Sequence, residues 1–495
     1  MKDSLYRLQN GTDIRGILIE TKDQKATITQ EDIKAIARGI VHWLSMKEDK
    51  KPNGMKIAVG MDSRITGPAV KATLMQELAE LGISVLDCGM ATTPAMFMTT
   101  IMEDYLCTCG IMITASHLPY NYNGFKIFTS SGITEKSDIK AILDYASERH
   151  QDKLESDQNR PICEVDLIED YSKILVRTII KETGMSKPFE NLKIIVDAGN
   201  GAGGFFASKV LANLGADTKG SQFLEPDGMF PNHIPNPENQ EAMEAISKAV
   251  LDHKADIGII FDTDVDRAAI VADDGMEINK NSLIALISDI VLREHPGTVI
   301  VTDSITSDAL TDFIQKRGGI HHRFQRGYKN VINEAIRINE ESEHESYLAI
   351  ETSGHGALRE NHFLDDGTYL TSKILIEAAK MNQEGKKIQS LIEDLKQPYE
   401  SVEYRLKITD PHFSDCADKV LEEIKDFALQ QENWEIVSPN YEGVKIRFPK
   451  GWFLMRKSLH EPVMPLNIEA DEEGFVKEVL GKLREFVKEQ NGIEF

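Results

Sequence analysis

Lys193-Ile-Ile-Val-Asp197, a short apolar run that ends at an acidic residue, is the kind of segment from which most of this chain is built. A helix-like stretch, Phe205–Leu214, follows it and ends at Gly-Ala before another strand-like run. Continuous apolar strands that alternate with helices are typical of a parallel sheet whose faces are covered by helices. The segment therefore predicts an α/β fold.

The same unit occurs at two further places along the chain. Lys56–Asp62 is followed by the helix-like Ala69–Leu81, and Thr298–Asp303 is followed by Ser307–Lys316. Three copies of one organisation predict three similar α/β domains in tandem, with mixed, mainly parallel sheets.

The C-terminal part has a different pattern. Ser401–Ile408 alternates like a half-exposed strand, Ser414–Leu429 has helical periodicity, and Glu472–Glu489 reads as a charged closing helix. Trp434–Val437 and Val444–Phe448 are again strand-like. These elements predict a smaller α+β domain. A chain of 495 residues is also too long for one hydrophobic core. The domains that we expect are 1–160, 161–295, 296–396 and 397–495.

Composition excludes some classes of partner. The formal net charge of −24 disfavours binding to a nucleic-acid backbone or to an anionic membrane. No apolar run approaches the roughly 20 residues that span a bilayer, and the N-terminus has no apolar signal core, so we expect a cytoplasmic protein. The five scattered cysteines indicate reduced thiols, with Cys107 and Cys109 buried in a strand. No pattern predicts the oligomeric state.

The strongest chemical signal is Asp262-Thr-Asp-Val-Asp-Arg267, which lies between the apolar runs Ile257–Phe261 and Ala268–Ala272. Three carboxylates at alternate positions repel one another and are costly to gather without a cation. An EF-hand Ca²⁺ loop would need Gly and Glu where this chain has Arg267 and Asp273. Mg²⁺ fits these oxygen ligands better, and a solvated acidic turn is the alternative.

A serine follows another apolar strand, in Thr114-Ala-Ser-His-Leu-Pro119. Ser116 thus lies where α/β sheets commonly hold ligand chemistry. A serine hydroxyl is a weak nucleophile unless a neighbour activates it, and His117 and Lys126 are close in sequence. Taken alone, the Ser-His pair is better explained by an ordinary polar loop.

Two later loops carry groups that bind sugars and phosphates. Glu351-Thr-Ser-Gly-His355 offers hydroxyl-binding side chains after the apolar run Tyr347–Ile350. Arg456-Lys-Ser-Leu-His460 gathers two cations, a hydroxyl and an imidazole, which suits a phosphate. Each loop alone is equally compatible with a surface turn.

Gly199-Asn-Gly-Ala-Gly-Gly204 matches the dinucleotide-binding pattern G-x-G-x-x-G, and Glu225 lies at the distance of a ribose ligand. That interpretation explains neither Ser116 nor the three aspartates. We therefore favour a tight strand-to-helix turn.

Taken in order, these loops resemble the motifs of the α-D-phosphohexomutase family. The matching segments are Gly11-Thr-Asp-Ile-Arg-Gly16, Thr114–Pro119 with Asn123–Lys126, Asp197–Gly204, Asp262–Arg267, Glu351–His355, and Arg456 with Ser458, Glu461 and Pro462. The likeness covers nearly the whole chain, and it implies four domains around a central cleft.

The resemblance also implies a role for each matched residue. Ser116 would carry a phosphate and, with Asp262, Asp264 and Asp266, would hold Mg²⁺. Lys126 and Arg267 would offset charge, and Lys126 or His355 would act as general acid or base. The substrate-binding residues expected on this basis are Arg15, Glu351, Ser353, Arg456, Ser458 and His460.

The chain departs from the family pattern at five positions: Leu118, Thr263, Ile350, Leu459 and His460. The atoms expected to carry the chemistry are retained. The sequence therefore predicts a phosphohexomutase that interconverts hexose 1-phosphate and hexose 6-phosphate, of glucose or mannose, through hexose 1,6-bisphosphate as intermediate and activator. The alternatives are a glucosamine phosphate mutase, a metal-dependent phosphatase and a non-catalytic protein that binds phosphosugars.

Overall fold

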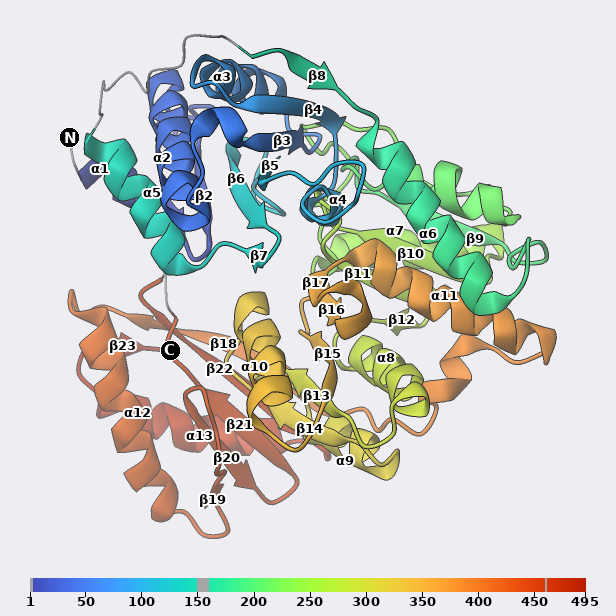
Figure 1. Cartoon of the computed structure of the whole chain (residues 1–495). Helices are drawn as coiled ribbons and strands as arrows, with labels where there is room; N and C mark the ends of the chain where they lie inside the picture. Colours follow the sequence, from blue (N-terminus) through green and yellow to red (C-terminus); the bar gives the residue numbers. More distant parts are fainter. Residues whose placement is uncertain (1–2, 149–159, 459–460) are drawn as a thin grey trace. The chain divides into compact units, whose positions relative to one another are not determined.

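The computed structural model describes residues 3–148, 160–458 and 461–495, and Figure 1 labels its elements. The chain divides into two compact units. Unit 1 consists of Met1–Asn279, Ser353–Ala357 and Leu364–Ile388, and unit 2 consists of Lys280–Thr352, Leu358–Phe363 and Gln389–Phe495. The expected order of three α/β domains and a fourth, sheet-rich domain is confirmed. No helix among the described residues is both long and apolar enough to cross a membrane.

The first sheet of unit 1 is mixed, and its strand order is β1-β2-β6-β5-β3-β4-β8, with β7 paired to β6. The strands are β1 (Gln9–Asn10), β2 (Asp13–Ile17), β3 (Lys56–Met61), β4 (Ser84–Met90), β5 (Cys109–Ile113), β6 (Tyr122–Thr129), β7 (Gly132–Ile133) and β8 (Ile162–Glu164). β5, β3, β4 and β8 are parallel. Because β8 pairs with β4, this sheet extends just past the expected domain end at residue 160.

Five helices accompany this sheet (Figure 1): α1 (Asp3–Tyr6), α2 (Gln30–Glu48), α3 (Gly67–Glu80), α4 (Thr93–Met98) and α5 (Lys136–Glu148). The sequence fixes where α2 begins, because Thr29 and Asp32 form a capping box. The apolar side chains of α2, α3 and α5 pack with those of β3 and β5 into one core. All five cysteines are free thiols, and Cys107 and Cys109 are buried as expected, but only Cys109 lies in a strand, β5.

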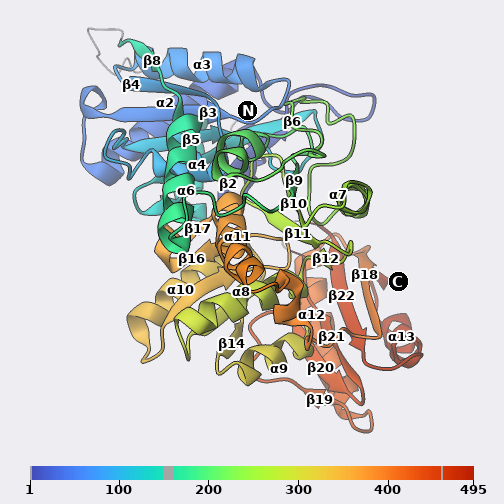
Figure 2. The same ribbon diagram turned by 90° about the vertical axis from the view of Figure 1, so that its right-hand side faces the viewer.

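The second sheet of unit 1 has the order β12-β11-β10-β9. Its strands are β9 (Ile194–Asp197), β10 (Ile257–Phe261), β11 (Ala268–Ala272) and β12 (Glu277–Ile278), and its helices are α6 (Leu167–Thr183), α7 (Gln240–His253) and α11 (Gly367–Gln383). Only β9 and β10 are parallel, because the Asp262–Arg267 loop returns the chain antiparallel as β11. α11 lies beside α6 (Figure 2), so a segment from much later in the chain completes this unit.

The helix expected over Phe205–Leu214 has an unusual winding. Phe206–Leu211 forms a π-helical turn, and Ala212–Leu214 continues as a 3₁₀ turn. Phe206, the first residue of the π turn, is fully buried, and its ring centroid lies 5.5 Å from that of Phe261. Apolar periodicity predicts that this segment is helical and buried, but it does not distinguish the type of helix.

Unit 2 begins with α8 (Asn281–Glu294) and three parallel strands, β13 (Val299–Thr302), β14 (Ile320–Arg323) and β15 (Ser346–Ile350), with β13 in the middle. The helices α9 (Asp308–Lys316) and α10 (Tyr328–Glu341) connect these strands. β16 (Gly356–Leu358) and β17 (Leu364–Asp365) follow, where the chain alternates between the two units.

The last sheet has the order β19-β20-β21-β22-β18-β23, and its pairings are antiparallel. The elements are β18 (Glu400–Ile408), α12 (Phe413–Leu429), β19 (Glu435–Ile436), β20 (Val444–Phe448), β21 (Gly451–Met455), β22 (Val463–Ala470), α13 (Phe475–Lys488) and β23 (Ile493–Glu494). The helices and the inner face of the sheet share one apolar core. This part is the predicted α+β domain.

His233 and Asp197, the last residue of β9, form a buried ion pair. Nε2 of His233 lies 3.0 Å from Oδ2 and 3.1 Å from Oδ1 of Asp197, and Nδ1 lies 3.0 Å from the carbonyl oxygen of Ile234. Since both ring nitrogens face acceptors, the imidazole is held as the cation. Burial acts to lower the pKa of His233, but the hydrogen bond and charge of Asp197 outweigh it and raise the pKa.

We predict that this pair makes stability fall with rising pH. The stabilisation is complete below the unfolded-state pKa of about 6.5 and is lost as the pH rises through the higher folded-state pKa. Thermal unfolding between pH 6 and pH 9.5 should show a smaller decline for His233→Asn than for the wild type. Parallel profiles for the two proteins would contradict the prediction.

Candidate active site

The loop that carries Ser116 is held from beneath by Arg64. The guanidinium of Arg64 donates hydrogen bonds to four carbonyl oxygens, those of Ser116 (2.5 Å), Leu118 (2.6 Å), Pro119 (2.7 Å) and Tyr122 (3.0 Å). Its Nε lies 3.2 Å from the buried carboxylate of Asp62, at the end of β3. Arg64 is fully buried, so these contacts exclude water and fix the course of the loop.

Ser116 has a left-handed backbone conformation with a φ of 52°, which non-glycine residues seldom adopt. Its N–H donates to Oγ1 of Thr114 (2.8 Å). Its Oγ lies 3.2 Å from Nδ1 of His117 and 3.4 Å from Oδ2 of Asp262. The hydroxyl is thus aimed at an imidazole and at the acidic loop, although the side chain is almost completely buried.

His117 is neutral at physiological pH. Burial and the nearby charge of Arg267 lower the pKa of His117 to about 2. Such a low pKa makes the imidazole a weak base, so its contact with the Ser116 hydroxyl is a hydrogen bond that orients Oγ.

The three aspartates of the acidic loop converge, as expected. Asp262, Asp264 and Asp266 are buried, and one carboxylate oxygen of each lies within 4.8 Å of the others. Val265, between the last two, has a φ of 68°, an outlier for a β-branched residue. The hydrogen bonds between Thr93 and Asp264, from the N–H to the carbonyl oxygen (2.9 Å) and from Oγ1 to Oδ2 (2.5 Å), help to hold this strained backbone.

Lys126 compensates part of the negative charge. It lies on β6 opposite Met112 of β5, and its Nζ contacts Oδ2 of Asp264 (2.9 Å) and Oδ2 of Asp266. Even so, Oδ1 of Asp264 and Oδ1 of Asp266 are buried and accept no hydrogen bond from the described residues. Buried carboxylate oxygens without donors fit a bound divalent cation.

The pKa values of Asp262 and Asp266 are shifted in opposite directions. Burial, with the charges of Asp266 and Asp264, raises the pKa of Asp262 well above its usual range. Burial acts in the same direction on Asp266, but Lys126 and other nearby cations hold the pKa of Asp266 well below its usual range. The raised pKa of Asp262 shows that ionisation of all three carboxyls is disfavoured unless further positive charge is supplied, as a metal ion would supply it.

Arg267 connects the acidic loop to the Ser353–Ala357 segment. Its backbone forms an antiparallel bridge with His355, and its Nε donates to Nε2 of His355 (3.2 Å). Because Arg267 is always a donor, Nε2 must accept, and Nδ1 of His355 donates to Oγ of Ser353 (2.8 Å). Nε2 of His355 also lies 3.6 Å from Oδ1 of Asp266. Three expected site residues, Arg267, Ser353 and His355, are thus brought together beside the aspartates.

Arg15 lies on β2, opposite Gly124 of β6. Its guanidinium donates to Oδ2 of Asp13 (2.6 Å), and its charge contributes to the low pKa of His117. The glycine is required here, because a Cβ at Gly124 would lie 2.0 Å from the carbonyl oxygen of Ile14. This close approach brings β2, and with it Arg15, against the strand that carries Lys126.

The glycine-rich turn after β9 supports the acidic loop. A Cβ on Gly201 would lie 2.7 Å from the carbonyl oxygen of Thr263, and the N–H of Ala202 donates to that oxygen (2.9 Å). The backbone of the acidic loop therefore packs directly against this turn. The tight-turn interpretation of Gly199–Gly204 agrees with this arrangement.

Unit 2 carries the remaining predicted residues. Oε1 of Glu351 accepts a hydrogen bond from the N–H of Gly327 (2.6 Å). The neighbouring Thr352 donates from its hydroxyl to Oδ2 of Asp303 (2.6 Å). Burial and the charge of Glu351 raise the pKa of Asp303 to about 7. Glu351 thus lies in a buried acidic environment at the end of β15.

Arg456 follows β21 and is buried, whereas Ser458 is half-buried. Oε1 of Glu442 lies 3.9 Å from a terminal nitrogen of Arg456. Oγ of Ser458 accepts from the N–H of Glu461 (3.2 Å). His460 and Leu459 lie outside the described residues.

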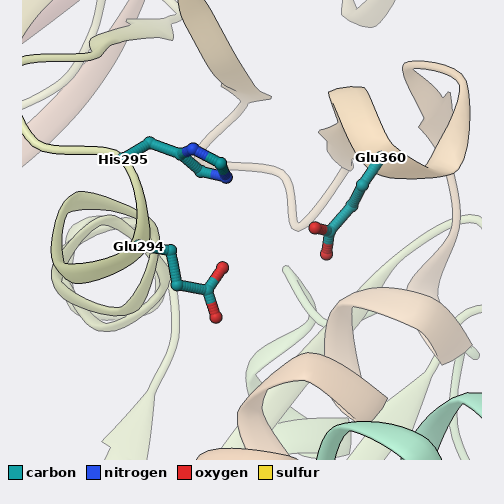
Figure 3. Close-up of side chains that lie close together, drawn as sticks. All are labelled: Glu294, His295 and Glu360. Carbon is teal, nitrogen blue, oxygen red and sulfur yellow. The ribbon is translucent and has the colours of Figure 1, made fainter.

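A second group of potential metal ligands consists of Glu294, His295 and Glu360, on the surface of unit 2 (Figure 3). Both glutamates are exposed. The imidazole of His295 stacks on Tyr347, with 3.6 Å between ring centroids. Exposed acidic groups gather without a metal in many proteins, and this group has none of the buried, donor-free oxygens of the acidic loop.

Sequence reasoning missed the structural role of Arg64. The sequence places Arg64 at the same edge of the sheet as Ser116, because Asp62-Ser-Arg64 follows β3 and the Ser116 loop follows β5, but it does not show what Arg64 contacts. The partners of Arg64 are backbone carbonyls, which every residue has. Its target loop therefore leaves no pattern in the sequence.

Comparisons with known proteins agree with this geometry. Three family models match, described as phosphoglucomutase/phosphomannomutase α/β/α domains I (residues 7–153), II (170–275) and III (279–399). A phosphomannomutase/phosphoglucomutase of Pseudomonas putida is 30% identical over 484 residues, which cover 97% of this chain and 94% of the relative. A phosphoglucomutase of Neisseria gonorrhoeae is 29% identical over 480 residues, 96% of this chain and 95% of the relative.

Among solved structures, a phosphoglucomutase/phosphomannomutase family protein of Burkholderia thailandensis has the same fold. Its TM-score is 0.79 at 24% identity, with 99% of each chain covered. The family models together match most of the chain, and the buried serine, the three aspartates and their cations lie within the matched segments. The chain therefore belongs to the phosphoglucomutase/phosphomannomutase family of phosphohexomutases.

Proposed function

We propose that the protein interconverts hexose 1-phosphate and hexose 6-phosphate, of glucose or mannose, through a phosphorylated Ser116. One observation carries the proposal: Oγ of Ser116 lies 3.4 Å from Asp262, in a buried acidic loop where Oδ1 of Asp264 and Oδ1 of Asp266 accept no hydrogen bond from the described residues. A nucleophile beside a divalent-cation site is what phosphoryl transfer requires. The isomerase activity of the family supports the same conclusion.

Mg²⁺ is the cation that we propose, held by Asp262, Asp264 and Asp266 with an oxygen of the Ser116 phosphate. When bound, it would neutralise the charge of the transferring phosphoryl group. Lys126 contacts two of these carboxylates and supplies further positive charge. Phosphoserine adds about −1.5 to −2 charges, which is why both cations are needed.

The chemistry balances over two transfers. In the first, a sugar hydroxyl oxygen attacks the phosphorus of phosphorylated Ser116, the Oγ–P bond breaks, and hexose 1,6-bisphosphate forms. In the second, Oγ of Ser116 takes the other phosphate, and the proton returns to the sugar oxygen. In each transfer the proton of the attacking hydroxyl passes to the departing oxygen, and Lys126 or His355 handles it at the sugar. Neutral His117, with Nδ1 3.2 Å from Oγ, orients the Ser116 hydroxyl.

Recognition of the sugar and of the stationary phosphate is assigned to other residues. We propose that Glu351 and Ser353 bind sugar hydroxyls, and that Arg15, Arg456, Ser458 and His460 bind phosphate. The ratio of kcat/KM for the 1-phosphates of glucose, mannose and glucosamine identifies the preferred sugar. We further propose that the enzyme is cytoplasmic and that its partners are phosphosugars. The domain limits that we propose are those expected from the sequence, with the first domain extended to include β8.

A coupled assay tests the proposed function against its rivals. A mutase forms hexose 6-phosphate from hexose 1-phosphate, is activated by hexose 1,6-bisphosphate and releases little inorganic phosphate. Net release of phosphate would indicate a phosphatase. Absence of both reactions, with all three sugars and Mg²⁺ present, would indicate a protein that only binds phosphosugars.

We predict that Ser116→Ala lowers turnover by several orders of magnitude, because the phosphate carrier is lost. Intact-mass spectrometry should detect one phosphate on the wild-type protein and none on the variant. Ser131→Ala, which removes an exposed hydroxyl near the end of β6, is the matched control and should retain both activity and phosphate. Turnover close to that of the wild type in Ser116→Ala would refute the covalent mechanism.

We predict that Asp264→Asn weakens Mg²⁺ use by about 10- to 100-fold, since it removes one anionic ligand and a partner of Lys126. Activity and calorimetric titrations with Mg²⁺ measure the change. Asp274→Asn, which removes an exposed carboxylate after β11, should leave the titration unchanged. If Asp264→Asn titrates as the wild type does, the acidic loop does not bind the metal.

We predict that Arg64→Lys lowers kcat by about 10- to 100-fold with a smaller change in KM, because lysine cannot contact four carbonyls and the Ser116 loop shifts. The rate at which hexose 1,6-bisphosphate phosphorylates Ser116 should fall with kcat. Arg38→Lys, in the Arg38–Glu77 ion pair of the same domain, is the control. A variant that loses thermal stability but keeps its phosphorylation rate would show that Arg64 supports only the fold.

A further inference from the structure

Glu442 connects two loops of unit 2 that each carry an arginine. Arg326 lies between β14 and α10, and its N–H donates to Oε2 of Glu442 (3.1 Å). Oγ of Ser304 donates to the same oxygen. The other carboxylate oxygen, Oε1, faces Arg456 at 3.9 Å. The two arginines, which are far apart in the sequence, therefore flank one carboxylate.

Arg456 has the surroundings of an anion ligand. Its side chain is only 9% exposed, and its Nε is buried without a hydrogen-bond partner among the described residues. The distance of 3.9 Å to Glu442 is too long for a hydrogen bond. A buried guanidinium with an unused donor is costly, and a phosphate satisfies it through two parallel hydrogen bonds.

Arg326 shares this neighbourhood. The positive charges of Arg326 and Arg456 both act on Glu403, and that of Arg326 helps to lower the pKa of Arg456. Nε of Arg326 lies 4.0 Å from Oδ2 of Asp303. The next residue, Gly327, donates its N–H to Glu351, the proposed sugar ligand. Arg326 is thus near both Arg456 and the group assigned to the sugar.

We propose that Arg326 is a second cationic ligand of the phosphate that is not being transferred, and that Glu442 competes with this phosphate for Arg326 and Arg456. The inference rests on the proposed function, because it assigns a residue to the phosphosugar site.

The backbone of Arg326, rather than its side chain, makes the contact with Glu442 that connects the two loops. The contact between Arg326 and Glu442 uses the backbone N–H, which every non-proline residue keeps. This hydrogen bond between the two loops therefore does not need the guanidinium. Truncation of the Arg326 side chain consequently tests ligand binding while the hydrogen bond is kept.

Calorimetry with glucose 1-phosphate tests the proposal, in a Ser116→Ala background that prevents transfer. Arg326→Ala should raise Kd at least tenfold, and Arg326→Lys should restore part of the affinity. Arg337→Ala removes a half-exposed arginine of α10 that pairs with Glu334 and Glu341, and it should leave Kd unchanged. Inorganic phosphate should follow the same order of affinities.

Glu442→Gln provides a change in the opposite direction. Its amide oxygen keeps the acceptor for Ser304 and for the N–H of Arg326, and its amide nitrogen replaces the oxygen that faces Arg456. Removal of the competing charge should lower Kd several-fold, a result that simple loosening of the loops would not give.

Several results would overturn the proposal. These are a Kd for Arg326→Ala within twofold of the parent, an equal loss in Arg337→Ala, or weaker binding by Glu442→Gln. The proposed function fails by a separate observation, the absence of isomerisation by the wild-type enzyme. Phosphate binding that depends on Arg326 in such a protein would still support the anion site.

Discussion

The concentration of negative charge in the Asp262–Arg267 loop is the constraint on which the rest of unit 1 depends. Three carboxylates share one buried space, and the backbone at Val265 is strained to bring them there. Such an arrangement persists only if surrounding groups supply positive charge and rigid contacts. Lys126 supplies charge from the first sheet, Arg267 supplies it from the loop itself, and the glycine-rich turn supplies a rigid backbone surface. Much of the fold around the loop thus serves to hold these oxygens in place.

The same constraint explains how Ser116 is placed. A hydroxyl that must meet the acidic loop cannot lie on a mobile turn, because a displacement of about 1 Å already costs much of the rate in an enzyme site. Arg64 fixes the loop through carbonyl oxygens rather than side chains. This explains in physical terms how Leu118 is accommodated where the family has asparagine: the contact made at this position is with the carbonyl. Side-chain identity matters at Ser116 and His117, whose side chains face the chemistry.

The positions of the almost completely buried strands could be predicted from the sequence. The runs Ile257–Phe261 and Ala268–Ala272 coincide with β10 and β11, because a strand buried on both faces must be apolar throughout and must stop where the aspartates begin. The aspartates could be predicted as one site because they share one loop. Arg64 could not, since it acts across a long sequence separation and contacts backbone carbonyls, which carry no sequence signature. The π turn at Phe206–Leu211 was missed because apolar periodicity is insensitive to the type of helix.

A strongly acidic protein that binds a phosphosugar must create its affinity locally. With a net charge of −24, the long-range field repels an anionic substrate. Long-range repulsion is screened by salt over roughly 8–10 Å, whereas a contact with a desolvated guanidinium is not. Arg456 and Lys126 are both buried, each beside carboxylates that keep it in place before the ligand arrives. These neighbouring carboxylates lower the cost of burying a cation, and they also reduce its attraction for phosphate. The balance between these two effects, rather than the total charge of the protein, sets how tightly the substrate is held and how readily it turns between the two transfers.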